Sequence, residues 1–171
     1  MSGRKPFSGN VEVFTFKEGL LSRVAHDLCI RVGEFAVEAG ETSVEASFAL
    51  HSLRVAHAMR EGTPDPSALS PKDRGQIEEN IRDKVLDAGR HPEATFHGTI
   101  TAGASALRIS GRLSLHGQEH ALELNAQEVD GRVRGEVEFA PSKWGIAPFK
   151  AMLGAIKLQD RVLVRFDLAR S

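Results

Sequence analysis

The sequence predicts a mainly β fold: a single domain of antiparallel strands that closes into a barrel around an apolar interior. Apolar and polar residues alternate in many short runs, turn-forming residues separate these runs, and only one long segment has helical periodicity. With 171 residues, 41% of them hydrophobic and 26% charged, the chain has the size and composition of one ordinary globular domain. We expect residues 1–10 to form an N-terminal tail and residues 11–171 to form the domain.

The strand prediction rests on period-two alternation, which places every second side chain on the same face of a sheet. In residues 43–50, one face carries Val44, Ala46, Phe48 and Leu50. Comparable runs occur at residues 11–16, 26–37, 94–100, 107–115, 122–126, 133–139 and 162–168.

Turn residues lie between these runs, and the pair Asp130-Gly131 gives the strongest hairpin prediction. Several short strands at such spacing are typical of a sandwich or a barrel. An eight-stranded barrel is near the size at which side chains either fill the interior or leave room for one ligand.

One segment in the middle of the chain has helical periodicity. Ser70 can cap a helix, Pro71 suits its first position, and Asp73 favours the positive N-terminus. Gly89 favours a stop, so the sequence predicts a helix over about residues 71–88 that covers one end or flank of the sheet. Its apolar stripe consists of Ile77, Ile81, Val85 and Leu86. A second, shorter helix is expected over residues 148–153.

Charge and targeting signals narrow the function class. The chain carries 22 Lys and Arg against 23 Asp and Glu, so it lacks the basic excess of a non-specific nucleic-acid binder. No apolar core follows the charged start, and no run approaches the roughly 20 apolar residues of a membrane span. We therefore expect a cytoplasmic protein without stable membrane insertion and without a nucleic-acid partner.

The sequence offers little for catalysis. Cys29, the single cysteine, cannot form an intramolecular disulfide and is expected to be a small packed residue. His116 and His120 are four residues apart, but Gly117 between them favours a turn, and no known metal or nucleophile motif is present. We expect no catalytic residue, no metal and no cofactor; a histidine- or metal-dependent enzyme is the weakest hypothesis and rests on the seven histidines alone.

Phenylalanines are spread across nearly every predicted element, and two interpretations are open. The phenylalanines fill the core, or some of them line a cavity that holds a ligand. A dense apolar stretch without clean alternation surrounds Trp144 and continues to Ile156. It is either a lid at a barrel mouth or a loop packed on the core.

Several short motifs resemble those of a known family, the YceI-like lipid-binding proteins, over roughly residues 11–168. After the predicted helix comes a histidine–proline pair, His91-Pro92, and then a strand that opens with Phe96. Residues 111–117 are similar to the family's G-x-L-x-x-H-G hairpin, and residues 144–146 read Trp-Gly-Ile. Near the start, His26, Gly33 and Phe35 resemble the family's early H…G-x-F pattern.

The resemblance implies an extended, eight-stranded, lipocalin-like antiparallel barrel with a helix packed against it. It also implies a tunnel that binds a long apolar chain, such as a polyisoprenoid, a quinone or a fatty amide or acid. A homodimer is compatible with the resemblance. Many members are periplasmic, so the missing signal peptide indicates a cytoplasmic branch. The residues expected to bind the ligand are Phe14, Phe16, His26, Leu28, Ile30, Phe48, Phe96, Trp144, Ile146, Phe149, Met152 and Leu153.

The leading hypothesis is a non-enzymatic carrier or sequestering protein for a long-chain amphiphile. Each buried CH₂ group contributes about 0.8 kcal/mol, whereas association costs roughly 4–15 kcal/mol, so about twenty buried carbons are needed for firm binding. His26 is the candidate partner of the head group, because it shares a strand face with Leu28 and Ile30; the alternative is a hydrogen-bonded core histidine. The competing function is a filled barrel that acts through its surface as a stress-related or partner-binding module.

Overall fold

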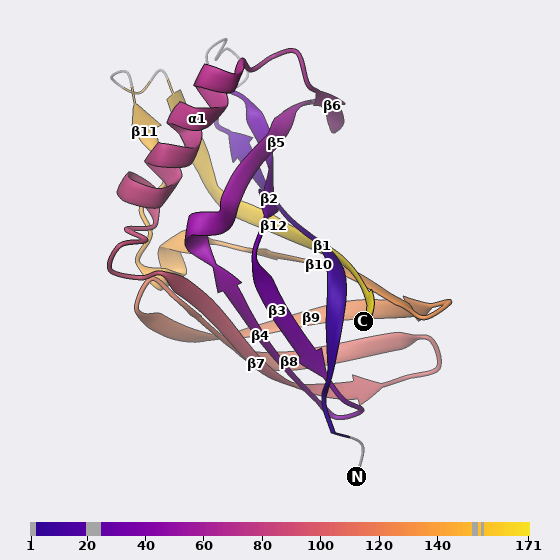
Figure 1. The fold of residues 1–171 in the computed structure, drawn as a ribbon. Helices are drawn as coiled ribbons and strands as arrows, with labels where there is room; N and C mark the ends of the chain where they lie inside the picture. Colours follow the sequence, from indigo (N-terminus) through magenta and orange to yellow (C-terminus); the bar gives the residue numbers. More distant parts are fainter. Residues whose placement is uncertain (1–2, 20–24, 152–153, 155) are drawn as a thin grey trace.

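The computed structural model describes residues 3–19, 25–151, 154 and 156–171. The strands that form the barrel are β1 (Lys5–Lys17), β3 (Phe35–Ala39), β4 (Ser43–Ala49), β7 (Glu93–Ala102), β8 (Ala106–Leu115), β9 (Gln118–Val129), β10 (Arg132–Phe139) and β12 (Ile156–Arg170). These eight pair antiparallel in the order β12-β10-β9-β8-β7-β4-β3-β1, and pairing between β1 and β12 closes the ring (Figure 1). The predicted eight-stranded antiparallel barrel is therefore confirmed.

Further strands and a short helix extend one end of the barrel. Strand β2 (Asp27–Val32) pairs with the second half of β1, and β5 (Leu53–Arg60) and β6 (Thr63–Asp65) follow beside it; β11 (Lys150–Ala151) lies at the opposite edge. The short helix η1 (Leu50–Ser52) separates β4 from β5, and Ser52 fixes this corner because its hydroxyl accepts a hydrogen bond from the Glu34 N–H at 2.9 Å. The same hydroxyl donates to the Ala49 carbonyl oxygen at 2.6 Å.

The predicted helix is confirmed as α1 (Pro71–Asn80), continued by the π-turn η2 (Ile81–Val85). Ser70 forms the expected cap, since its hydroxyl accepts from the Asp73 N–H at 3.1 Å and the Asp73 carboxylate accepts from the Ser70 N–H at 3.0 Å. The helix ends slightly before the predicted position, because Asp87 adopts a left-handed φ of 49°. Figure 1 shows α1 beside β5 at one end of the barrel, and its apolar stripe packs against the core.

Two local predictions are wrong. Residues 5–10 belong to β1 and pair with β3 and β12, so the expected tail of residues 1–10 does not exist beyond residue 4 in the described part of the chain. Residues 148–151 of the expected second helix (residues 148–153) are not helical, because Lys150 and Ala151 form β11 and pair with Lys157 and Ile156; residues 152 and 153 lie outside the described residues. A short helix nearby is η3 (Pro141–Trp144), which begins at a proline. Proline is favoured at the first position of a helix, because the N–H that it lacks would have no partner there.

The hairpin at Asp130-Gly131 is as predicted. Both residues have positive φ, 53° and 78°, which is the type I′ geometry that matches the twist of the flanking strands. His116 and Gly117 repeat this geometry between β8 and β9, with φ of 54° and 77°.

Candidate functional site

The strands surround a large cavity that is open to solvent and has a volume of about 1760 Å³. Ligand pockets usually have volumes of about 300–1,000 Å³, so this interior is far from filled. Inward-facing side chains of successive strands form its wall. Val164 of β12, Val133 of β10, and Leu122 and Leu124 of β9 are examples from three neighbouring strands. The interior therefore offers a long, continuous apolar surface, which a filled barrel would not have.

Helix α1 and the turn η2 close one side of this cavity. Ile77, Ile81, Val85 and Leu86 line it and are only partly buried by protein atoms, because their apolar stripe faces the open interior. The Glu78 carboxylate accepts a hydrogen bond from the Val55 N–H at 2.8 Å, which ties α1 to β5. The helix is thus part of the cavity wall, as well as a cover over the sheet.

Polar side chains gather at the two ends of the cavity. At the helix end these include His26, Asp73, Gln76 and Asn80; at the other end, charged residues come from β1 and from the hairpin loops and strand ends around it. The start of β12 adds Gln159, Asp160 and Arg161 to the lining. The pKa of the Asp73 carboxyl is lowered, mainly by its hydrogen bonds with Ser70, and the charge of His26 acts in the same direction. His26 and Asp73 both line this end of the cavity.

Thr15 lines the cavity next to the His26 end. It pairs in register with Leu28, which follows His26 by two residues. Its hydroxyl oxygen is shielded from water and has no hydrogen-bond partner among the described residues. An unpaired buried hydroxyl costs about 1–3 kcal/mol. The wall therefore contains unused hydrogen-bonding capacity at this end.

Most of the residues predicted to bind a ligand lie in the cavity wall. These are His26, Leu28, Ile30, Phe48, Phe96, Ile146 and Phe149. Met152 and Leu153 lie outside the described residues. Strand alternation places Leu28, Ile30, Phe48 and Phe96 on inward faces, and His26 lies just before β2. Ile146 and Phe149 reach the wall from the loop after η3.

Phe14 and Phe16 do not line the cavity, and the prediction that they do is wrong. Val11, Val13 and Thr15 face inward on β1, so the period of two turns the two phenylalanines outward. A guanidinium group lies over each ring: Cζ of Arg165 is 4.8 Å from the Phe14 ring centroid, and Cζ of Arg161 is 3.8 Å from that of Phe16.

Trp144 is also absent from the cavity wall. Its side chain is 0% exposed, and its indole N–H donates to the Leu113 carbonyl oxygen at 2.8 Å. The rings of Phe139 and His120 meet it edge-on at centroid distances of 5.0 and 5.5 Å. The Trp144 side chain therefore attaches η3 to the barrel. Of the two alternatives for this segment, a lid or a loop packed on the core, this contact favours the packed loop at Trp144.

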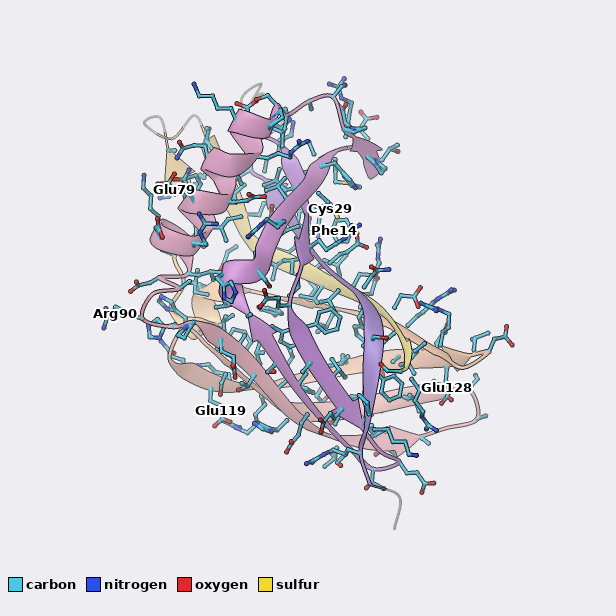
Figure 2. The ribbon with its side chains drawn as sticks, viewed as in Figure 1. Phe14, Cys29, Glu79, Arg90, Glu119 and Glu128 are labelled. Atoms are coloured by element: carbon cyan, nitrogen blue, oxygen red, sulfur yellow. The ribbon has the colours of Figure 1, made fainter. Side chains whose placement is uncertain are left out.

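Cys29 lies on the outer side of the barrel wall, beside Phe14 (Figure 2). Burial and a hydrogen bond to Glu12, with 3.2 Å between Sγ and Oε2, raise the pKa of the thiol to about 12. Because only a thiolate is nucleophilic, this side chain is inert at neutral pH.

The histidines do not gather into a metal centre in the described part of the chain, where no group of three potential ligands occurs. His91 and His116 approach each other, with 4.8 Å between their ring centroids, but no third ligand joins them. Among the described residues, no helix is long and apolar enough to cross a membrane.

Comparison with solved structures supports the fold. BcnA from Burkholderia cenocepacia superposes with a TM-score of 0.65 at 15% identity, covering 94% of this chain and 96% of that one. A polyisoprenoid-binding domain from Saccharophagus degradans gives 0.62 at 11% identity, covering 99% and 98%. The YceI protein of Campylobacter jejuni gives 0.56 at 10% identity, covering 83% and 84%.

A search of curated proteins by sequence gives no match. The family model of the YceI-like domain, in contrast, matches residues 10–169, which is nearly the whole chain. The barrel, the packed helix and the cavity follow the architecture that the motifs around Phe96 and Gly111 imply. The chain therefore belongs to the YceI-like family.

Proposed function

We propose that this protein binds a long-chain amphiphile, such as a polyisoprenoid, a quinone or a fatty amide or acid, and carries or sequesters it inside the barrel. The observation that supports this proposal is the apolar cavity of about 1760 Å³ running between the helix end and the hairpin end. A chain of about twenty carbons would gain roughly 16 kcal/mol there at 0.8 kcal/mol per CH₂ group, which exceeds most estimates of the cost of association. The description of the Saccharophagus degradans neighbour as a polyisoprenoid-binding domain agrees with a ligand of this kind.

The head group is proposed to lie at the helix end of the cavity. His26, Gln76 and Asn80 offer hydrogen-bonding side chains there, and the unpaired Thr15 hydroxyl lies in the same wall. A polar head, such as a hydroxyl, an amide or a quinone carbonyl, can form hydrogen bonds with this set, because the side chains include both donors and acceptors. The tail would then point toward the hairpin end.

Organic extraction of the purified protein followed by mass spectrometry tests the proposal directly. The expected result is a co-purified long-chain lipid, or binding of added solanesol and parinaric acid by the protein freed of lipid. Leu124→Trp adds an indole to the cavity wall and should reduce binding, whereas Gln127→Trp adds one to the outer face of the same strand and should not. Absence of any lipid together with absence of probe binding would refute the proposal.

The proposed role is non-enzymatic and needs no metal or cofactor. The high pKa of the Cys29 thiol supports this, because the side chain with the most nucleophilic potential stays protonated. The alternative of a filled barrel acting through its surface is less well supported, since the interior is hollow. A cytoplasmic location and a homodimer stay predictions, which cell fractionation and light scattering of the purified protein can check.

A further inference from the structure

Three glycines occupy inward-facing positions in the barrel wall, at places where a side chain would normally pack. Gly98 on β7 and Gly111 on β8 are direct neighbours across the two strands, and Gly135 lies on β10 beside Phe166 of β12. A glycine inside a strand weakens it, because it loses more backbone entropy and has no side chain to pack. Three of them in one wall therefore need a structural reason.

The reason is the position of two phenylalanine rings. A Cβ atom placed on Gly98 would lie 2.8 Å from Cε1 of Phe96, and one on Gly111 would lie 2.7 Å from Cζ of the same ring. A Cβ atom on Gly135 would lie 2.6 Å from Cζ of Phe166. Each ring therefore rests directly on glycine backbone, in space that any other residue would occupy.

This arrangement affects the width of the cavity. Side chains on a sheet normally stand roughly perpendicular to it, so an inward phenylalanine would project into the interior of the barrel. Phe96 instead leans along its own strand over Gly98, and Ala46, its partner on β4, is small as well. The ring fills part of the wall and leaves the interior open.

We propose that Gly98, Gly111 and Gly135 set the width of the tunnel by holding the rings of Phe96 and Phe166 flat against the wall, which admits a long apolar chain past them. This inference rests on the proposed function for its ligand, but the placement of the rings is independent of any ligand. The competing explanation is that the glycines only allow the sheet to bend into a barrel.

Gly98→Ala is the sharpest test. The new methyl group meets only the movable ring of Phe96 at short distance, with the Ser110 carbonyl oxygen at 3.2 Å, so the ring must swing toward the interior. Gly111→Ala is unsuitable, because its Cβ would lie 2.2 Å from the His97 carbonyl oxygen and the backbone itself would have to move.

The first measurement is a double-mutant cycle of the free energy of unfolding, with lipid-free protein. Gly98→Ala should destabilise the wild type, and the same change should cost little when Phe96 is already alanine. If the glycines serve only to bend the sheet, the cost of Gly98→Ala will be equal in both backgrounds, and that result would overturn the inference. Gly75→Ala, on the exposed side of α1 with nothing within 4 Å, is the control for a glycine replacement as such.

The second measurement is binding of parinaric acid, with displacement by solanesol. Gly98→Ala should weaken binding about tenfold, equivalent to keeping about two methylene groups out of the wall, and Phe96→Ala/Gly98→Ala should recover it. Unchanged binding by a folded Gly98→Ala variant, or no recovery in the double variant, would contradict the inference. Lack of binding by the wild type would instead refute the proposed function. The double-mutant cycle of the free energy of unfolding would then still test whether the glycines hold the rings against the wall. If Gly98→Ala does not fold, Phe96→Leu replaces it, and it should admit a bulkier chain than the wild type does.

Discussion

The indole N–H of Trp144 donates a hydrogen bond to the backbone carbonyl oxygen of Leu113, and the two atoms are 2.8 Å apart. This bond joins η3, just after β10, to the middle of the sheet at β8. Asp160 on β12 holds the other side of η3, because its carboxylate accepts hydrogen bonds from both the N–H and the hydroxyl of Ser142. The segment that leads into the cavity wall at Ile146 is thus fixed at its start.

Replacing Trp144 with phenylalanine should destabilise the protein. The variant keeps most of the apolar volume but leaves the Leu113 carbonyl oxygen without its donor in a fully buried place. The expected loss in the free energy of unfolding is about 1–3 kcal/mol, with a further contribution from the smaller ring. Urea denaturation measures it. An unchanged midpoint would show that the hydrogen bond contributes nothing to stability.

The Cys29 thiol should make stability depend on pH in alkaline solution. Its pKa is raised from 9.0 to about 12 in the folded protein by burial and by the Glu12 hydrogen bond. Because the folded pKa lies above the unfolded one, the contribution is complete below pH 9.0 and is lost as the pH rises toward about 12.

Cys29→Ala removes this titration. The free energy of unfolding of the wild type should therefore fall more steeply between pH 9 and 12 than that of the variant. At neutral pH, the native protein should also react slowly with iodoacetamide, and urea should speed the reaction. Parallel pH profiles of the two proteins would contradict the proposed cause.

Ser70→Ala should weaken the start of α1. The Ser70 hydroxyl accepts a hydrogen bond from the Asp73 N–H, and the backbone N–H of Ser70 donates one to the Asp73 carboxylate. Loss of an N-terminal cap costs about 1 kcal/mol. The pKa of the Asp73 carboxyl is lowered first by the hydrogen bond from the Ser70 backbone N–H, which the variant keeps, and then by the Ser70 side chain, which the variant loses. The part contributed by the side chain is present at neutral pH and is lost as the pH falls through the lowered pKa. Thermal unfolding at neutral and acidic pH checks this: the difference between Ser70→Ala and wild type should shrink in acid.

Much of the fold could be predicted from local patterns. Alternation in β4 and β8 determines which side chains face the interior, and the Ser70 cap with its following apolar stripe determines the helix. These signals are local, because one face of each element is apolar and the other is polar. The pattern around Lys150 was too short to distinguish a helical turn from a two-residue strand, and only its pairing with β12 decides.

The candidate site was less predictable where both faces of a strand are apolar. In β1, Val13 and Phe14 are both apolar, so the sequence does not show which of the two faces the interior. The arginine that lies over Phe14 is Arg165 of β12, which is far away in the sequence. The role of Trp144 depends on a backbone acceptor in β8, which no sequence pattern identifies. Whether the interior is hollow depends in turn on where rings such as Phe96 lie.

Glu78 should control how firmly the helix covers the cavity. Its carboxylate accepts from the Val55 N–H on the helix side of β5, so Glu78→Ala leaves that N–H without its partner and loosens the contact between α1 and the barrel. The expected cost is about 1–3 kcal/mol, because the lost bond is to a charged group. Glu79→Ala is the matched control, since Glu79 is exposed and points away from the barrel (Figure 2). Hydrogen exchange should rise at Val55 and along α1 in Glu78→Ala only. If the two variants exchange alike, the helix is held by its apolar stripe, and the Glu78 contact contributes nothing further.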